Sequence, residues 1–353
     1  MTQAENTHST RMGRKKTMLF VLVFLLIAVL GLMYVKWVPY YHKADLAATT
    51  HSIGESIFSG MTDEVSWQSG LEYAAAYFKS VWKAAVLGII LGSLIQVLLP
   101  TNWLIKVLGK TNFSSTAVGG VASLPGMMCT CCAAPVAVGL RKRKASIGAS
   151  LAFWMGNPTL NPATLVFMTF VLSWKFTLLR VVFGIIIVFG ISYLANRFAP
   201  KVDAVEIDKM MEEVEEEETG SFLSRWIKSM GNMILYIVPA YILSVLLLGA
   251  ARTWLFPEIS SEAANGLIAI ILFAMAGMLF VIPTAAEIPI IQTFMAFGLG
   301  GGPAAALLVT LPAISLPSMI MVGKSFPTKV LLFVAGAVVI VGVLCGLVGM
   351  YLF

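Results

Sequence analysis

The chain has 353 residues, of which 58% are apolar and only 12% are charged, and its mean hydropathy is +0.88. Soluble domains carry about 45–50% apolar and about 25% charged residues, so the composition excludes an ordinary soluble fold. It predicts an all-α integral membrane protein embedded in the lipid bilayer. Basic residues outnumber acidic ones, 24 to 18. In a membrane protein such an excess sets topology, and we expect no nucleic acid partner.

The chain begins with a basic tail, 1–17, followed by an apolar run, 18–35. This run is longer than the apolar part of a signal peptide, and no small-residue cleavage site follows it. It is therefore predicted to be one extra N-terminal span, with the tail in the cytoplasm. The stretch 36–77 contains two lysines and five acids, which favours an extracytoplasmic loop.

Acidic residues mark the segments that lie in water, because a carboxylate is costly in hydrocarbon. They divide the rest of the chain into two apolar blocks, 78–197 and 226–353. These blocks are predicted to be the membrane-embedded part through which a solute passes. An acidic linker, 198–225, joins the blocks and is predicted to be a solvated helix or a spacer.

The two blocks share a pattern of prolines. Shifting the second block by 154 residues aligns Pro135 with Pro289, and the same offset aligns Pro158 with Pro312. The equal spacing, with similar hydropathy around it, predicts two homologous helical repeats, as in many secondary transporters. The sequence leaves open whether the repeats are parallel or inverted, and on which side of the membrane the linker lies.

Glycines and prolines interrupt the apolar segments of both blocks, so their helices are predicted to be broken or re-entrant. Irregular backbone at membrane depth is tolerated only where it is buried in protein or lines a wet cavity. The breaks thus indicate a solute path through the middle, and kinked helices with a packing role are the alternative. Segment 113–140 is predicted to re-enter, because a full crossing would place the basic run 141–144 outside.

Three thiols lie within four residues, at Cys129, Cys131 and Cys132. Soft sulfur donors select soft partners such as Cu(I), Zn(II) or, by the same chemistry, trivalent arsenic. In an extended segment Cys129 and Cys131 would point the same way and could bind a soft metalloid, and the vicinal Cys131 and Cys132 are the other possible pair. The alternative is that the thiols are small apolar residues at a tight helix crossing, which is our interpretation of Cys345.

Glu287 lies inside an otherwise apolar stretch, 263–321, and an ionisable residue within the membrane is a candidate functional group. Since burial favours the protonated form of a carboxyl group, Glu287 is predicted to carry a coupling proton. A structural ion pair with a basic residue such as Arg180 is the alternative. Asn157 and Asn161 each precede a proline, and their amides are expected either to bind a polar solute or to cap broken helices.

Three stretches of the first block carry a family resemblance. Cys129–Leu140, Ala145–Phe153 and Asn157–Pro162 resemble the predicted-permease family that includes the ArsP-type organoarsenical efflux permeases. In that family a Cys-Ser-Cys-like run precedes a proline, a glycine-rich turn and a Pro-Asn-type break, and a weaker copy follows in the second half.

The resemblance covers 75–197 and 226–353, and Glu287 matches the carboxylate of the second copy. It implies a multi-pass permease of the bacterial inner membrane, which in some members exports trivalent organoarsenicals. The chain departs from the family pattern at Thr130, where serine is usual, at the additional Cys132 and in its basic run. These departures concern the solute and not the fold.

Together the residues and the resemblance predict a secondary permease, not an enzyme, that exports a soft, thiol-reactive small molecule or metalloid such as a trivalent (organo)arsenical. No cofactor is expected. One alternative is a permease or channel for an unrelated small solute, with the cysteines merely packed. Another is a membrane thiol-redox protein that uses Cys131 and Cys132.

Overall fold

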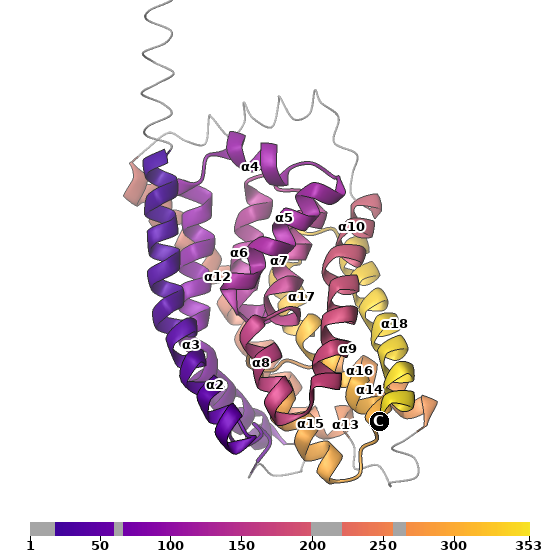
Figure 1. Ribbon diagram of the computed structural model, residues 1–353. Coiled ribbons are helices and arrows are strands. Elements are labelled where there is room, and N and C mark those ends of the chain that lie inside the picture. The colour runs from indigo at the N-terminus through magenta and orange to yellow at the C-terminus, as the bar shows by residue number, and fades with distance from the viewer. Residues whose placement is uncertain (1–17, 60–65, 199–220, 257–265) are drawn as a thin grey trace, which may run out of the picture.

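The computed structural model describes residues 18–59, 66–198, 221–256 and 266–353. Within these ranges the chain is helical and contains no strand. The helices that are long and apolar enough to cross a membrane are Met18–Thr50, Trp67–Leu98, Trp174–Phe198, Phe222–Ala250, Gly301–Val322 and Thr328–Leu352. The protein is therefore a multi-pass all-α membrane protein, as predicted (Figure 1). The basic tail and almost all of the acidic linker lie outside the described residues.

Each half of the chain places shorter helices between two long ones. The first half contains α3 (Trp67–Leu98), α4 (Thr101–Leu108), α5 (Phe113–Ser123), α6 (Thr130–Lys142), α7 (Ile147–Thr159), α8 (Pro162–Val171) and α9 (Trp174–Ile185), which continues through α10 (Ser192–Ala195). The second half contains α12 (Phe222–Ala250), α13 (Arg252–Leu255), α14 (Leu267–Leu279), α15 (Glu287–Ala296), α16 (Gly301–Ala313), α17 (Leu316–Val322) and α18 (Thr328–Leu352).

The helices of the two halves correspond in their bounds as well as their order. α7 and α16 begin 154 residues apart and also end 154 residues apart. The same holds for the long helices Trp174–Phe198 and Thr328–Leu352. Figure 1 shows α5 and α6 toward one end of the molecule, next to α4, and α14 and α15 toward the other. We call these two ends the α4 end and the α15 end.

Corresponding long helices run antiparallel to each other. Near the start of α12, Trp226 Nε1 donates to Ser93 Oγ near the end of α3 at 3.0 Å. At the other end of this pair, Gly70 of α3 lies against the backbone of Leu246 in α12. The first helix of one half therefore runs opposite to the first helix of the other.

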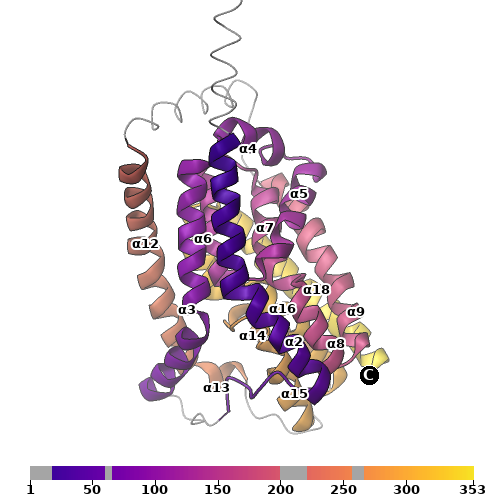
Figure 2. The ribbon, with the colours of Figure 1, turned by 60° about the vertical axis from the view of Figure 1, so that its left-hand side comes forward.

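The N-terminal helix is longer than predicted. It does not end near residue 35 but continues to Thr50, so the first part of the predicted loop, 36–77, is helical, and α3 begins at Trp67. A lysine normally ends an apolar span, but Lys36 is only 6% exposed because it faces protein. Figure 2 shows this helix running from the α4 end toward α15, across the face of the molecule.

The middle of this helix is a π-helical turn, Met33–Trp37. Here the Val38 N–H donates to the carbonyl of Met33, five residues earlier. Pro39 follows in the first turn of α2 (Val38–Thr50), and a proline cannot donate the usual helical hydrogen bond. Single π turns of this kind are frequent at functional sites, although a second π segment, Ile186–Ile191, lies in the helix Trp174–Phe198.

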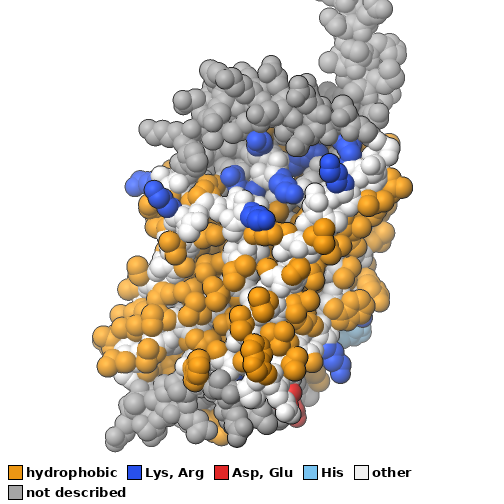
Figure 3. Space-filling model, turned by 180° about the vertical axis from the view of Figure 1, so that it is seen from behind, with side chains coloured by type: hydrophobic (Ala, Val, Ile, Leu, Met, Phe, Trp, Pro, Cys, Tyr) orange, Lys and Arg blue, Asp and Glu red, His pale blue; other side chains and the backbone are white. Residues whose placement is uncertain are grey.

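Lysine and arginine side chains gather in a band at the α4 end, as Figure 3 shows on one face of the molecule. The elements that meet there include α4, the end of α6, the start of α12 and the turn between α17 and α18. Their basic residues are Lys106, Arg141, Lys142, Arg143, Lys144, Arg225, Lys228 and Lys324. Apolar side chains cover the surface below this band in the same view.

Glycines bring α3 and α6 into backbone contact. A Cβ atom at Gly88 would lie 2.1 Å from the Cys132 carbonyl oxygen, and one at Gly92 would lie 2.3 Å from that of Pro135. No larger residue fits at either position without moving a helix. The helix that carries the thiols is therefore held directly against the long helix α3.

Candidate functional site

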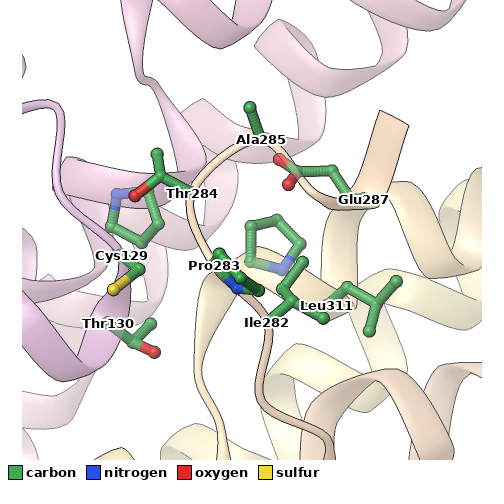
Figure 4. A pocket seen from close by; sticks show the side chains of 10 residues that line it. Cys129, Thr130, Ile282, Pro283, Thr284, Ala285, Glu287 and Leu311 are labelled. Atoms are coloured by element: carbon green, nitrogen blue, oxygen red, sulfur yellow. The ribbon is translucent and has the colours of Figure 1, made fainter. Parts of the chain in front are cut away.

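The chain breaks of both halves meet at one small pocket (Figure 4). Its walls come from the starts of α6 and α15 and from the ends of α7 and α16, and they consist of Cys129, Thr130, Pro158, Ile282, Pro283, Thr284, Ala285, Glu287, Leu311 and Pro312. In this conformation about 10 Å³ is available to the centre of a water molecule, which is room for about one water. Figure 4 shows Cys129 and Glu287 on opposite sides of the loop that carries Thr284.

Both breaks contain backbone conformations that residues other than glycine rarely adopt. Met127, before α6, has a φ of 49°, and Ala285, before α15, has a φ of 69°. Such left-handed residues cost of order 1–3 kcal/mol and persist only where the surroundings fix them, often at functional sites. Here they turn the chain so that α6 and α15 both begin at the pocket.

Two helix N-termini lie at the pocket wall. Cys129 is the N-cap of α6, Glu287 is the first residue of α15, and no side chain caps either helix. The N–H groups of a first helical turn lack partners within the helix and carry the positive end of the helix dipole. The pocket therefore lies between two partial positive charges, one from each half.

The three adjacent thiols do not share one environment. Cys129 lines the pocket, and its Sγ donates to Cys132 Sγ at 3.1 Å. Cys131 points elsewhere, with its Sγ 3.9 Å from Ser315 Oγ. The paired thiols are thus Cys129 and Cys132, and not Cys129 and Cys131 as an extended segment would place them, because α6 already begins at Thr130.

This arrangement reveals a motif that the sequence interpretation missed. Cys129 and Cys132 form a Cys-x-x-Cys pair at the N-terminus of a helix, an arrangement known from disulfide oxidoreductases. Among the described residues no group of three or more His, Cys, Asp or Glu side chains could hold a metal ion. The geometry therefore suits two sulfur ligands to one soft centre better than three.

Glu287 forms a buried ion pair. Its Oε1 accepts from Arg180 Nη2 at 3.0 Å, and the two side chains are 2% and 0% exposed. The pair is the structural alternative that the sequence offered for Glu287. Its second oxygen, Oε2, is buried and has no hydrogen-bond partner among the described residues, and the residue lines the pocket.

Arg180 also satisfies backbone carbonyls that the breaks leave without partners. Nε donates to Thr159 O at 2.7 Å and Nη2 donates to Pro158 O at 2.8 Å, both at the end of α7. Nη1 donates to Leu308 O in α16 at 2.5 Å. Four residues after Leu308 stands Pro312, which has no N–H to donate to that carbonyl. One guanidinium therefore supports both halves.

The two asparagines have different places. Asn161 is the N-cap of α8, and its Oδ1 accepts from the N–H groups of Ala163 and Thr164 at 3.0 and 3.3 Å. Asn157 Nδ2 donates to Phe153 O at 2.9 Å within α7. Neither asparagine is among the residues that line the pocket. Asn161 has the capping geometry that the sequence offered as an alternative, and contact of either amide with solute stays a prediction.

The N-terminal helix reaches both breaks, which the sequence interpretation did not foresee. Trp37 Nε1 donates to Pro125 O at 2.8 Å, just before the thiols. Lys36 Nζ donates to Thr284 Oγ1 at 3.1 Å in the loop before α15 and to Tyr40 Oη at 3.0 Å. The signal that could have found Lys36 is the apolar and aromatic sequence that continues beyond it to Tyr41.

Comparison with known proteins matches the chain to a family. A family described as predicted permeases matches residues 117–351, more than half of the chain and all of the pocket walls. The chain belongs to this family. UPF0718 protein YraQ of Escherichia coli (strain K12) is 53% identical to this permease over 328 residues, which cover 92% of this chain and 93% of the relative.

A more distant relative is UPF0718 protein MJ0584 of Methanocaldococcus jannaschii. It is 21% identical over 327 residues, which cover 74% of this permease and 90% of the relative. No solved structure matches this permease. The resemblance inferred from the sequence motifs is thus confirmed at the level of the predicted-permease family.

Replacing Arg180 with methionine is expected to destabilise this permease by about 3–5 kcal/mol, because it leaves a buried carboxylate unpaired. The carbonyls of Pro158, Thr159 and Leu308 also lose their donor. Thermal unfolding in detergent measures the change. The control is Arg197→Met, which removes an exposed arginine and should leave the midpoint nearly unchanged. Equal midpoints for the two variants would show that Arg180 does not support the breaks.

Proposed function

We propose that the pocket is the solute site of a secondary permease that exports a soft, thiol-reactive solute such as a trivalent (organo)arsenical. The observation that carries this proposal is that Cys129 from the first half and Glu287 from the second line the same cavity. A soft sulfur donor prefers a soft partner, and a cavity bounded by broken helices between two repeats is the usual solute position in such transporters.

The proposal includes an internal duplication with inverted repeats. It is supported by the matching bounds of α7 and α16 and by the antiparallel course of α3 and α12. The hairpins α5–α6 and α14–α15 would then re-enter from opposite ends of the molecule. The proposed repeats are 78–197 and 226–353, and a solute held between them can be released to either side.

We also propose an orientation. The basic band lies at the α4 end (Figure 3), and positive residues near span ends are retained in the cytoplasm. The α4 end is therefore assigned to the cytoplasm of a bacterial cell and the α15 end to the outside of its inner membrane. Because α9 runs toward the α4 end and α12 starts there, the chain leaves the first repeat and enters the second at the cytoplasmic end.

The thiol pair suits reversible binding of trivalent arsenic. Each thiol that binds replaces one hydroxyl on arsenic, forms an As–S bond and releases one water. Cys129 lines the pocket, and Cys132 lies 3.1 Å behind it, so the second sulfur can follow the first. Two ligands leave the solute exchangeable, whereas three would hold it too firmly for release.

Replacing Cys129 with serine is expected to lower methylarsenite transport into inverted vesicles by at least about tenfold, because oxygen is a poor ligand for a soft centre. Cys345→Ser serves as the control, since Cys345 is a buried thiol of α18 outside the pocket. Equal transport by the parent and the Cys129→Ser variant would remove the arsenical part of the proposal and leave the permease assignment intact.

Glu287 is proposed to carry the coupling proton. Its free Oε2 lies in the pocket wall, and protonation would weaken the ion pair with Arg180 that joins the two halves. Glu287→Gln is expected to abolish the response of transport to an imposed pH gradient, and Glu55→Gln, an exposed carboxylate, is expected to keep it. Coupling by Glu287 is refuted if the glutamine variant responds to the gradient like the parent.

A second candidate function rests on the 3.1 Å approach of the two sulfurs at the start of α6. A Cys-x-x-Cys pair in this position is typical of thiol–disulfide exchange. The permease proposal expects Cys129 and Cys132 to stay reduced during transport, and thiol trapping with a gel-shifting maleimide measures this. A disulfide that forms and disappears with cell growth conditions would favour the redox function over arsenical export.

A further inference from the structure

Lys36 is a buried cation that has no acidic partner among the described residues. It lies in the middle of the membrane-spanning helix Met18–Thr50 and is 6% exposed. Its hydrogen bonds go to Tyr40 Oη and Thr284 Oγ1, both neutral groups. An ammonium group has three donors, so one remains for another ligand. A buried charge is normally paired, and within the described residues no carboxylate pairs with Lys36.

The position of Lys36 is tied to the pocket. Thr284, which accepts from its ammonium group at 3.1 Å, lines the pocket together with Cys129 and Glu287. The π turn at Met33–Trp37 positions this lysine, while Trp37 next to it holds the break before the thiols. The ammonium group of Lys36 is thus not part of the pocket lining but is joined to it by the hydrogen bond to Thr284.

The charges around the pocket do not cancel. Among the described residues at the pocket, Arg180 and Glu287 neutralise each other in a direct ion pair, which leaves Lys36 as a surplus positive charge. The starts of α6 and α15, neither of which has a side-chain cap, add the positive ends of two helix dipoles. In a low-dielectric interior such a surplus acts strongly on a charged group nearby.

From this arrangement we infer that the pocket selects solutes that carry an anionic group, and that Lys36 provides the cation that binds it. This inference rests on the proposed solute site and narrows its solute class to thiol-reactive molecules with a negative group such as a carboxylate or a sulfonate. The soft centre faces Cys129, while the anionic group takes the remaining donor of the lysine. The N-terminal helix is thereby a third contributor to the site, beside the two repeats.

The first test measures the charge selectivity of Cys129 without using arsenic. A variant with Cys131→Ser, Cys132→Ser and Cys345→Ser keeps Cys129 as its sole cysteine, and its labelling rate is compared for two methanethiosulfonates. One carries a sulfonate and the other a trimethylammonium group. In both reactions the thiolate attacks the reagent sulfur, forming a mixed disulfide and releasing methanesulfinate. The ratio of the two rates cancels any change in the reactivity of the thiol itself.

The anionic reagent is expected to react at least about tenfold faster than the cationic one, because of the surplus positive charge. Lys36→Met should bring the ratio close to one, and Lys36→Arg, which keeps the charge, should preserve it. Lys83→Met, which removes an exposed lysine of α3, is the matched control and should not change it. A parental ratio near one, or a ratio that Lys36→Met leaves unchanged, overturns the inference.

The second test separates this inference from the proposed function. Transport is compared for phenylarsenite and for the same molecule with a para-carboxylate, so that the arsenic is the same and only the charge differs. The inference expects Lys36→Met to lower transport of the carboxylated probe selectively and Cys129→Ser to lower transport of both. If neither probe is carried but Cys129 labelling is charge-selective, the arsenical proposal fails and the anion site stands. If both probes lose transport equally in Lys36→Met, the anion site fails.

Discussion

Backbone carbonyls that lose their helical partners inside a membrane need another donor, because no bulk water is available there. Arg180 is that donor at the breaks of both halves, since it binds the carbonyls of Pro158 and Thr159 in α7 and that of Leu308 in α16. Its charge is in turn balanced by Glu287 at the start of α15. The irregular chain around the pocket is therefore stable because one ion pair spans it.

The rest of the site follows from where the helices begin. α6 and α15 start at the pocket after left-handed residues, Met127 and Ala285, and this brings a thiol from one half and a carboxylate from the other to the same pocket. The N-terminal helix contacts both breaks, because Trp37 donates a hydrogen bond to the break before α6 and Lys36 donates one to the break before α15. Three separate parts of the chain thus share a single centre.

The fold class could be predicted because composition alone reports the bilayer, and the paired breaks could be predicted because proline cannot continue a helix. Which two thiols pair could not be predicted, since a run of small residues does not tell where α6 begins. Because α6 begins at Thr130, Cys129 pairs with Cys132 instead of Cys131. Lys36 could not be placed either. A lysine that follows a long apolar run indicates the end of a span, whereas burial of Lys36 against Thr284 allows the helix to continue to Thr50.

The glycine contacts between α3 and α6 have a mechanical consequence. With Gly88 and Gly92 packed directly on the carbonyls of α6, no side chain separates the two helices at these positions, so we expect them to move together. α6 meets α17 differently, through the hydroxyl groups of Thr130 and Ser315 at 3.3 Å. If the pocket widens, we expect α6 to slide past α17 at this hydroxyl contact. α3 is then expected to move together with α6.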